Sequence, residues 1–216
     1  MVKGTVGVRP RLVIATRSAH KRRELADLFR LERAELLTLD DLGVPGVPVE
    51  DGATFEANAR IKARFAAAAT GLPSLADDSG IEVEALDGGP GVLTRRYSGP
   101  DATDVTNNAK LLAALDGLPP ERRGARYVCV LALALPDARG SGGGPLLIFR
   151  RGTCRGRIAA GPRGGAGFGY DPIFEPIGEP WGGRTFGQFS AAEKRAISHR
   201  AWAARRMLPV LRARGF

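Results

Sequence analysis

The sequence predicts an α/β fold, a mixed central sheet with helices packed against it. Two observations lead to this prediction. Short apolar stretches, typical of buried strands, alternate along the chain with longer stretches in which apolar residues recur every three or four positions, as in amphipathic helices. Such an alternation is typical of a sheet covered by helices. The chain has 216 residues, and we expect one domain over residues 11–216 after a mobile basic arm of residues 1–10.

The composition narrows the possible functions. The net charge is +9, but the arginines are dispersed along the chain, so the charge favours an anionic partner without identifying it. The longest apolar run, residues 128–135, is too short to span a membrane, and the N-terminus lacks a signal-peptide core, so we expect a cytoplasmic protein and no membrane partner. Cys129 and Cys154 show no metal-ligand spacing and are interpreted as a core thiol and an incidental one.

The first predicted strand, residues 11–15, leads through a short polar loop into a helix whose apolar spacing begins at Leu25. Free amide groups and the positive end of the helix dipole favour an anion at such a helix start, and Lys21 adds a charge there. This arrangement predicts a seat for phosphate groups. A plain solvated helix start remains the alternative, because the loop lacks the glycine and lysine pattern of a P-loop.

A second strand is predicted at residues 35–39, followed by a loop interrupted by prolines and then by a helix over residues 54–70, with Thr54 as its N-cap. Glu50 stands near the end of the loop and taken alone is an ordinary surface acid. Asn58 and Lys62 are four residues apart and therefore share one face of the helix. Lys62 can supply a second cation to a phosphate site, or the face can simply be solvated.

The stretch from residue 76 to residue 99 is the most informative part of the chain. The segment Asp77-Asp78-Ser79-Gly80 is predicted to be a turn between a short apolar segment and an alternating one, which places oxygen ligands for a hard cation at the edge of a sheet. Adjacent side chains of an extended strand point to opposite faces, so one carboxylate faces a given cleft. We predict that Asp78 is that carboxylate, although the composition is also that of an ordinary turn.

The later elements follow from the same signals. Glycines predict a turn at residues 88–91, apolar spacing predicts a helix at residues 103–115, and a flexible hairpin loop is expected at residues 136–145. Further strands are predicted at residues 126–135, 146–150 and 153–159.

A glycine-rich loop carries two aromatic residues, Phe168 and Tyr170, separated by Gly169. Glycines allow the backbone to approach a ligand closely, so the two rings predict a stacking surface for a flat base. Asp171 is held at a restricted angle by the following proline. The alternative is that the rings form a hydrophobic plug.

A capping box at residues 190–193 predicts the start of a helix that carries Lys194. In one unbroken helix Lys194, His199 and Arg200 would point in different directions and would not meet. A break at Ser198, followed by a second helix over residues 199–208, would bring them together. His199 by itself is more typical of a structural role than of a chemical one.

Together these motifs resemble the inosine triphosphate pyrophosphatase family, also called non-standard purine nucleoside triphosphate pyrophosphatases. The resemblance extends from about Leu12 to Leu211 and rests on residues 76–80, 85–91, 96–99, 168–172 and 194–200. It implies two lobes with the active site in the cleft between them, a homodimer, and magnesium-dependent hydrolysis. The implied substrates are ITP, dITP and XTP, which are cleaved to the nucleoside monophosphate and pyrophosphate and so cleared from the nucleotide pool.

The resemblance also implies roles for individual residues. Glu50 and Asp78 would bind Mg²⁺, and Asp78 would accept a proton from the attacking water. The implied substrate-binding residues are Thr16, Arg17, Ser18, Lys21, Lys62, Ser79, Phe168, Gly169, Tyr170, Asp171, Lys194, His199 and Arg200. The chain departs from the family pattern at Arg17, where glycine is usual, at Ser18, where asparagine is usual, and at Gln188, where glutamate is usual.

The chemistry of Arg200 gives part of the specificity. Its guanidinium only donates hydrogen bonds, so it favours the C6 carbonyl of hypoxanthine or xanthine over the amino group of adenine. Guanine also carries a C6 carbonyl, and Ser18 and His199 are the candidates for excluding GTP. Two other interpretations remain: a basic nucleic-acid-binding protein without catalysis, which would be retained on DNA in moderate salt, and a phosphoryl-transfer enzyme with an aspartate nucleophile. We expect no specific nucleic-acid partner.

Overall fold

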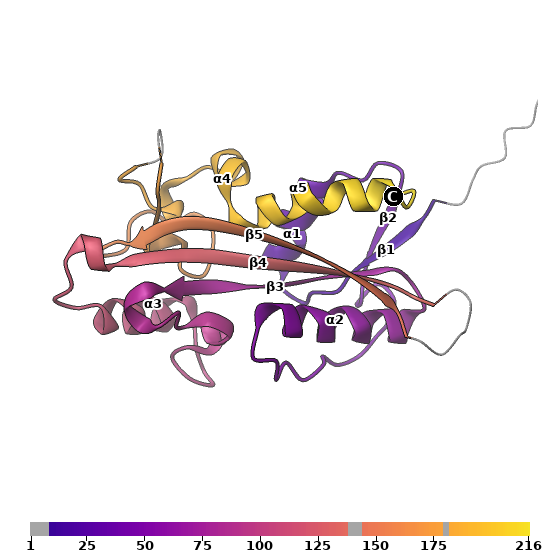
Figure 1. The fold of residues 1–216 in the computed structure, drawn as a ribbon, viewed down its shortest axis with the longest axis horizontal. Coiled ribbons are helices and arrows are strands. Elements are labelled where there is room, and N and C mark those ends of the chain that lie inside the picture. Colours follow the sequence, from indigo (N-terminus) through magenta and orange to yellow (C-terminus); the bar gives the residue numbers. More distant parts are fainter. Residues whose placement is uncertain (1–8, 138–143, 179–181) are drawn as a thin grey trace, which may run out of the picture.

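The computed structural model describes residues 9–137, 144–178 and 182–216 (Figure 1). Most of the predicted N-terminal arm and the centre of the predicted loop at residues 136–145 lie outside these ranges. Within them, none of the helices combines the length and the apolar character needed to cross a bilayer.

One six-stranded sheet forms the centre of the molecule, with the strand order β2-β1-β3-β4-β5-β6. Strand β1 pairs in parallel with both β2 and β3, whereas the pairs from β3 to β6 are antiparallel, so the predicted mixed sheet is confirmed. The strands are β1 Arg11–Ile14, β2 Glu35–Thr38, β3 Ser74–Val83, β4 Gly124–Leu135, β5 Leu146–Ile158 and β6 Phe174–Pro176.

Helices cover both faces of this sheet. They are α1 Ala19–Phe29, α2 Phe55–Thr70, α3 Asp104–Ala114, α4 Ala191–Ile197 and α5 His199–Arg212. Figure 1 shows α1, α4 and α5 on one side of the long strands and α2 and α3 on the other. The predicted flanking helices are therefore confirmed.

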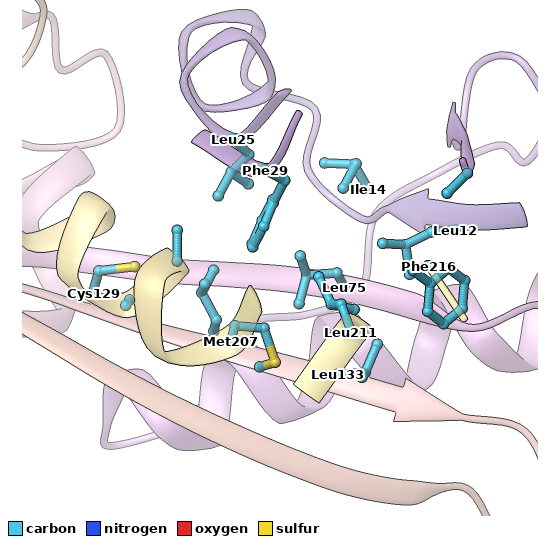
Figure 2. Packing of buried hydrophobic residues seen from close by; sticks show 14 residues of the cluster. Leu12, Ile14, Leu25, Phe29, Leu75, Cys129, Leu133, Met207, Leu211 and Phe216 are labelled. Atoms are coloured by element: carbon cyan, nitrogen blue, oxygen red, sulfur yellow. The ribbon is translucent and has the colours of Figure 1, made fainter. Parts of the chain in front are cut away.

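Alternate residues of a strand pack into separate apolar clusters on the two faces of the sheet. Leu12 and Leu75 pack with Leu25 of α1 and Met207 of α5 on one face, as Figure 2 shows. The neighbouring residue Val13 faces the other way and packs against the alanines of α2. Small side chains on α2 allow this helix to lie close to the sheet, which brings Lys62 near β3.

The helix boundaries follow the predicted caps. Thr54 caps α2 by accepting a hydrogen bond from the amide of Ala57, and Gly71 ends the helix with φ 67°. Ser198 ends α4 and at the same time caps α5, so the predicted break at Ser198 is confirmed. Helix α5 continues to Arg212, four residues beyond the predicted end.

Two predictions about strands are wrong. Residues 77–80 are not a turn at a strand end but lie inside β3, where each carboxylate is paired with basic side chains from a different face. Residues 146–150 and 153–159 are not two strands but one, β5, which passes through Gly152. A side chain at Gly152 would collide with the backbone of α5, so glycine is required there by close packing rather than by a turn.

Strand β1 covers only the first part of the edge of β3. Strand β1 pairs with β3 only at Ser74 and Leu75, while β3 continues to Val83. The loops that follow β1 and β2 therefore leave the sheet beside Asp77 and Asp78. The division of the molecule into two lobes with a cleft between them stays a prediction, as does the division into arm and domain.

Candidate active site

Asp77 and Asp78 occupy adjacent positions of β3 and face opposite sides of the sheet. Asp77 pairs with Lys21 of α1 and Arg200 of α5, whereas Asp78 pairs with Lys62 of α2. The predicted separation of the two carboxylates is therefore confirmed.

The environment of Asp77 is closed and strongly positive. Its Oδ1 lies 2.5 Å from Lys21 Nζ, and its Oδ2 lies 3.1 Å from Arg200 Nε. The thiol of Cys129 also donates to Oδ2, at 3.0 Å. Complete burial favours the neutral acid, but the charges of Arg200 and Lys21 outweigh this and hold the pKa of Asp77 well below its usual value. Asp77 is therefore a permanent anion that orients two cations.

The environment of Asp78 is more open and contains a second acid. Lys62 Nζ lies 2.6 Å from Asp78 Oδ1 and 2.8 Å from Glu50 Oε2. Burial raises the pKa of Asp78, and the charges of Lys62 and Lys21 offset this only in part. A carboxylate with a raised pKa is better suited to accept a proton than one held as a permanent anion.

Glu50 is held near Asp78 by its own loop. Asn58, which the helical spacing placed on the same face as Lys62, accepts a hydrogen bond from the amide of Gly52 at 2.8 Å. Asn58 thus fixes the end of the loop that carries Glu50, while Lys62 contacts the carboxylate itself.

The pair of carboxylates fits a magnesium ion. Two acids converge on a single cation, the ammonium group of Lys62, and offer only hard oxygen donors to it. Among the described residues no group of three His, Cys, Asp or Glu side chains forms a metal cage. Mg²⁺ characteristically uses one or two carboxylates and completes its shell with water and phosphate oxygens, so two acids beside a phosphate site are sufficient.

The loop between β1 and α1 leads into the start of α1, where the sequence predicted a phosphate seat. Ser18 is the N-cap of α1 and accepts a hydrogen bond from the amide of Lys21 at 3.4 Å, while the amide of Ser18 donates to Thr16 Oγ1 at 3.3 Å. The first turn of α1 carries no acidic residue. Amide groups of the first turn and the helix dipole therefore remain available to an anion, next to Lys21, which pairs with Asp77.

Arg17 lies in this loop, but its side chain turns away from Asp77 and Asp78. Its guanidinium pairs with Asp40 and donates to the carbonyl groups of Val44 and Gly46, at 2.6 and 2.7 Å. The prediction that the Arg17 side chain binds substrate is not supported by these contacts, because its donors are directed to the loop before Glu50.

The predicted two-ring surface is reduced to one ring. The Phe168 ring lies against His20 with the ring centroids 5.0 Å apart and the planes at 22°, and Lys194 Nζ is 4.8 Å from the Phe168 centroid. Tyr170 is only 2% exposed, and its hydroxyl donates to the carbonyl of Thr94. The prediction of a stacking role for Tyr170 is wrong in this conformation, because its ring is part of the core.

Gly169 and Asp171 shape the loop around Phe168. Gly169 has φ 65°, and its amide donates to Asp104 at 2.7 Å. The carboxylate of Asp171 accepts from the amide of Phe168 at 2.8 Å and from Lys194 Nζ at 2.6 Å. Asp171 thereby fixes the backbone beneath the Phe168 ring.

The break at Ser198 brings Lys194 and Arg200 to a common acid. Lys194 Nζ lies 2.9 Å from Glu24 Oε1, and Arg200 pairs with the other oxygen of Glu24. Arg200 also donates to Ser79 Oγ at 2.8 Å, which places Ser79 in the same network. The prediction that the break allows these side chains to meet is confirmed for Lys194 and Arg200.

His199 points into the core instead. It is 4% exposed and stacks on Tyr127 with centroids 4.6 Å apart and planes at 8°. Burial, together with the charges of Arg200 and Lys194, holds the pKa of His199 well below its usual value. Its buried Nδ1 has no hydrogen-bond partner in the described structure.

A model of the Ham1 family matches residues 12–210, nearly the whole chain. The chain belongs to the Ham1 family. A dITP/XTP pyrophosphatase of Syntrophobacter fumaroxidans is 49% identical over 88% of this chain and 76% of that protein. One of Mycobacterium bovis is 48% identical over 94% of this chain and 96% of that protein.

Solved structures of Ham1 proteins have the same fold. The Ham1 protein of Coxiella burnetii superimposes with a TM-score of 0.81 at 39% identity, covering 94% of this chain and 99% of that one. A nucleoside-triphosphatase and dITP/XTP pyrophosphatase of Mycobacterium abscessus gives a TM-score of 0.72 at 42% identity, covering 92% and 99%. The resemblance stated from the sequence motifs is therefore confirmed.

Two contributors to this Ham1 site were not predicted from the sequence. Glu24 joins Lys194 to Arg200, and His20 faces the Phe168 ring. Glu24 lies three residues after Lys21 and so shares its helix face, a signal that was available in the sequence. His20 gave no such signal, because its partner is distant in the chain.

Gln188, which departs from the pattern in the resembled family, closes a short turn. Its side-chain oxygen accepts a hydrogen bond from the amide of Thr185 at 3.1 Å. A neutral amide is sufficient for this role.

Proposed function

We propose that this Ham1 protein hydrolyses the deaminated purine nucleotides ITP, dITP and XTP to the nucleoside monophosphate and pyrophosphate, in a reaction that requires Mg²⁺. The observation that carries this proposal is the convergence of Glu50 and Asp78 on one cation beside the phosphate seat at the start of α1. Relatives named dITP/XTP pyrophosphatase support the choice of substrate.

The triphosphate is proposed to lie beside Asp77 and Asp78, where β3 extends beyond its pairing with β1. Lys21 and the amide groups at the start of α1 would bind it from one side of the sheet, and Lys62 from the other. Lys62 would exchange its contacts with Glu50 and Asp78 for contacts with phosphate oxygens when the nucleotide binds. Thr16, Ser18 and the backbone of Arg17 would line the loop around the phosphates.

Asp78 is proposed to accept the proton of the attacking water. Its place beside the phosphate seat suits this role, whereas Asp77 is held as an anion by Lys21 and Arg200. Mg²⁺ bound between Glu50 and Asp78 would supply positive charge that stabilises the negative charge developing on the phosphate oxygens. Asp77 would act indirectly, by holding Lys21 and Arg200 in place.

The base is proposed to stack on Phe168, with Lys194 and Arg200 at its edge. Arg200 Cζ lies 5.8 Å from the Phe168 centroid, and Ser79, Gly169 and Asp171 hold the surrounding groups in position. Side chains that only donate hydrogen bonds favour a C6 carbonyl and leave the amino group of adenine without an acceptor. His199 and Tyr170 are proposed to support this site from the core. The protein is further proposed to act as a homodimer in the cytoplasm, without a specific nucleic-acid partner.

The test is pyrophosphate release from ITP, dITP, XTP, GTP and ATP, measured with and without Mg²⁺ for the wild type and for Asp78→Asn. We expect release from the first three nucleotides only, dependence on Mg²⁺, and a loss of at least about 100-fold in Asp78→Asn, the scale of general-base catalysis. Asp51→Asn, which changes an exposed acid next to Glu50, is the matched control and should keep its activity.

Three outcomes would contradict the proposal. Equal turnover of GTP or ATP would contradict the substrate class. Activity that survives Asp78→Asn would contradict the role of Asp78. Retention on DNA in moderate salt without any pyrophosphate release would favour the nucleic-acid-binding interpretation instead.

A further inference from the structure

Arg17 connects the two loops that the proposed reaction requires. It lies between Thr16 and Ser18 in the loop at the start of α1, so its backbone belongs to the phosphate seat. Its side chain, however, ends in the loop between β2 and α2, which carries Glu50. An arginine suits this connection, because its guanidinium group presents five donors in a planar fork and can reach an acid and two carbonyl groups at once.

Val44 packs against the apolar cluster beneath α2, but the residues of the contacted segment that follow it have little packing support. Arg17, Asp40 and residues 43–47 surround an open hollow of about 430 Å³. Val47 and Val49, the residues that lead towards Glu50, are 65% and 78% exposed. Hydrogen bonds must therefore supply most of the restraint on this part of the loop.

The bonds from Arg17 are placed to give that restraint. Within the described ranges, the hydrogen bonds that reach the carbonyls of Val44 and Gly46 from outside the loop come from the Arg17 guanidinium. Gly46 is four residues before Glu50. Beyond Glu50, the bond between Gly52 and Asn58 fixes the other end of the segment. Glu50 is thus held between two anchors, one of which is Arg17.

We propose that Arg17 is a positioning residue that ties the phosphate loop to the Glu50 loop and so keeps Glu50 in place to bind the metal with Asp78. This inference rests on the proposed function, because it concerns the proposed metal ligand. It also assigns a role to an arginine at a position where the resembled family usually has glycine. Arg17 acts on the reaction through Glu50 and makes no contact with the substrate through its side chain.

Arg22 provides a matched control. It also pairs with Asp40, at 3.3 Å, and is exposed to a similar degree, 31% against 30% for the Arg17 side chain. Arg22 contacts the same acid, but within the described residues the donors to the carbonyls of Val44 and Gly46 belong to Arg17. Replacing Arg22 therefore removes one positive charge beside Asp40, as replacing Arg17 does, but leaves the hydrogen bonds to the carbonyls of Val44 and Gly46 intact.

The experiment compares Arg17→Met, Arg17→Lys and Arg22→Met with the wild type. Hydrogen exchange of the peptide over residues 41–52 is measured without nucleotide or metal, and Mn²⁺ binding is measured by electron paramagnetic resonance without nucleotide. We expect Arg17→Met to exchange about tenfold faster and to bind Mn²⁺ about tenfold more weakly, the effect of losing charge-assisted hydrogen bonds. Arg22→Met should match the wild type.

The kinetic readout separates positioning from direct binding. In Arg17→Met the Mg²⁺ concentration for half-maximal activity should rise about tenfold, while kcat at saturating Mg²⁺ and the KM for ITP stay within about twofold of the wild type. Arg17→Lys should recover only a small part of the Mn²⁺ affinity, because an ammonium group lacks the planar fork. Melting temperatures identify a variant that fails to fold, in which case Asp40→Asn replaces it and should show a smaller effect in the same direction.

The results that overturn the inference are distinct from those that overturn the proposed function. Wild-type exchange and Mn²⁺ affinity in Arg17→Met would show that the loop does not depend on Arg17. A raised KM for ITP with an unchanged loop would show that Arg17 binds the substrate directly. If the wild type releases no pyrophosphate, the proposed function fails, while the exchange and Mn²⁺ measurements still decide the role of Arg17.

Discussion

The two faces of β3 treat neighbouring carboxylates in opposite ways. Asp77 is enclosed by an arginine, a lysine and a thiol, and its side chain is completely buried. Asp78 meets a single lysine, which it shares with a partly exposed acid, Glu50. The same residue type, one position apart in the chain, therefore has a pKa well below its usual value on one face and a raised pKa on the other.

This difference separates structural from chemical roles. A carboxylate with two tightly bound cations keeps its charge and its geometry, which suits the positioning of Lys21 and Arg200. A carboxylate whose lysine can move away is able to exchange partners and to take up a proton. The alternation of side chains along a strand is sufficient to produce both environments from two consecutive aspartates.

Replacing the two aspartates should affect the stability of the protein to very different degrees. Asp77→Asn leaves the ammonium of Lys21 without its anion and the buried guanidinium of Arg200 with Glu24 as its remaining acid, and we expect it to lower the free energy of unfolding by about 3–5 kcal/mol. Asp78→Asn leaves Lys62 paired with Glu50, and the cost of burying the Asp78 charge offsets its ion pair, so we expect this variant to change the free energy of unfolding by less than about 1 kcal/mol. Urea denaturation of both variants measures the difference.

If both variants lose the same free energy of unfolding, both carboxylates are structural and the two faces of β3 do not differ in role. The activities of the same two variants also test which carboxylate takes part in the reaction. Asp78→Asn should be folded and inactive, whereas activity lost in Asp77→Asn should accompany its loss of stability.

A smaller effect is expected from the thiol on the Asp77 face. Burial and the charge of Asp77 raise the pKa of Cys129 well above its usual value, so the thiol stays protonated and donates to the carboxylate. Cys129→Ala removes this donor and should lower the free energy of unfolding by about 2 kcal/mol, the scale of a hydrogen bond to a charged group.

Cys129→Ser is the matched control, because its hydroxyl keeps a donor at the same position. Its loss should be less than half that of the alanine variant in the same denaturation measurement. If both variants lose the same amount, packing of the sulfur rather than its hydrogen bond to Asp77 explains the effect.

Local signals in the sequence were enough to predict much of the fold. Caps at Thr54, Ser190 and Ser198 act on neighbouring residues, so the helix starts were visible in short segments. The break at Ser198 was predicted from helix geometry together with the resemblance to the family, because an unbroken helix would separate Lys194 from Arg200, which the resemblance places in one site. Contacts within one turn of helix need no knowledge of the rest of the chain.

The failures involve partners that are distant in the chain. The segment around Asp77 and Asp78 has the composition of a turn, but backbone pairing with β4 and cations from other elements make a strand favourable there. Tyr170 and Phe168 are equivalent as sequence signals, but the hydrogen bond from Tyr170 to Thr94 directs that ring into the core. The local pattern contains no information about which of two aromatic residues will find such a partner.

Buried His199, on the same side of β3 as Asp77, should make the stability of the protein depend on pH. His199 is neutral in the fold because burial and the charges of Arg200 and Lys194 hold its pKa well below the value it has in the unfolded chain. Below about pH 6.5 the unfolded state therefore binds a proton that the folded state does not, so stability falls as the pH falls. This contribution amounts to at most about 1.4 kcal/mol for each pH unit.

His199→Gln removes the titrating group and keeps a polar side chain at the position. The difference in the free energy of unfolding between wild type and variant should therefore shift in favour of the variant between pH 7 and pH 5, measured by urea denaturation at each pH. His20, the other histidine, is present in both proteins, so its contribution cancels in the difference. A difference that stays constant over this range would mean that His199 accepts a proton in the folded state, and hence that the core around Tyr127 admits a charge that Asp77 and Asp171 stabilise.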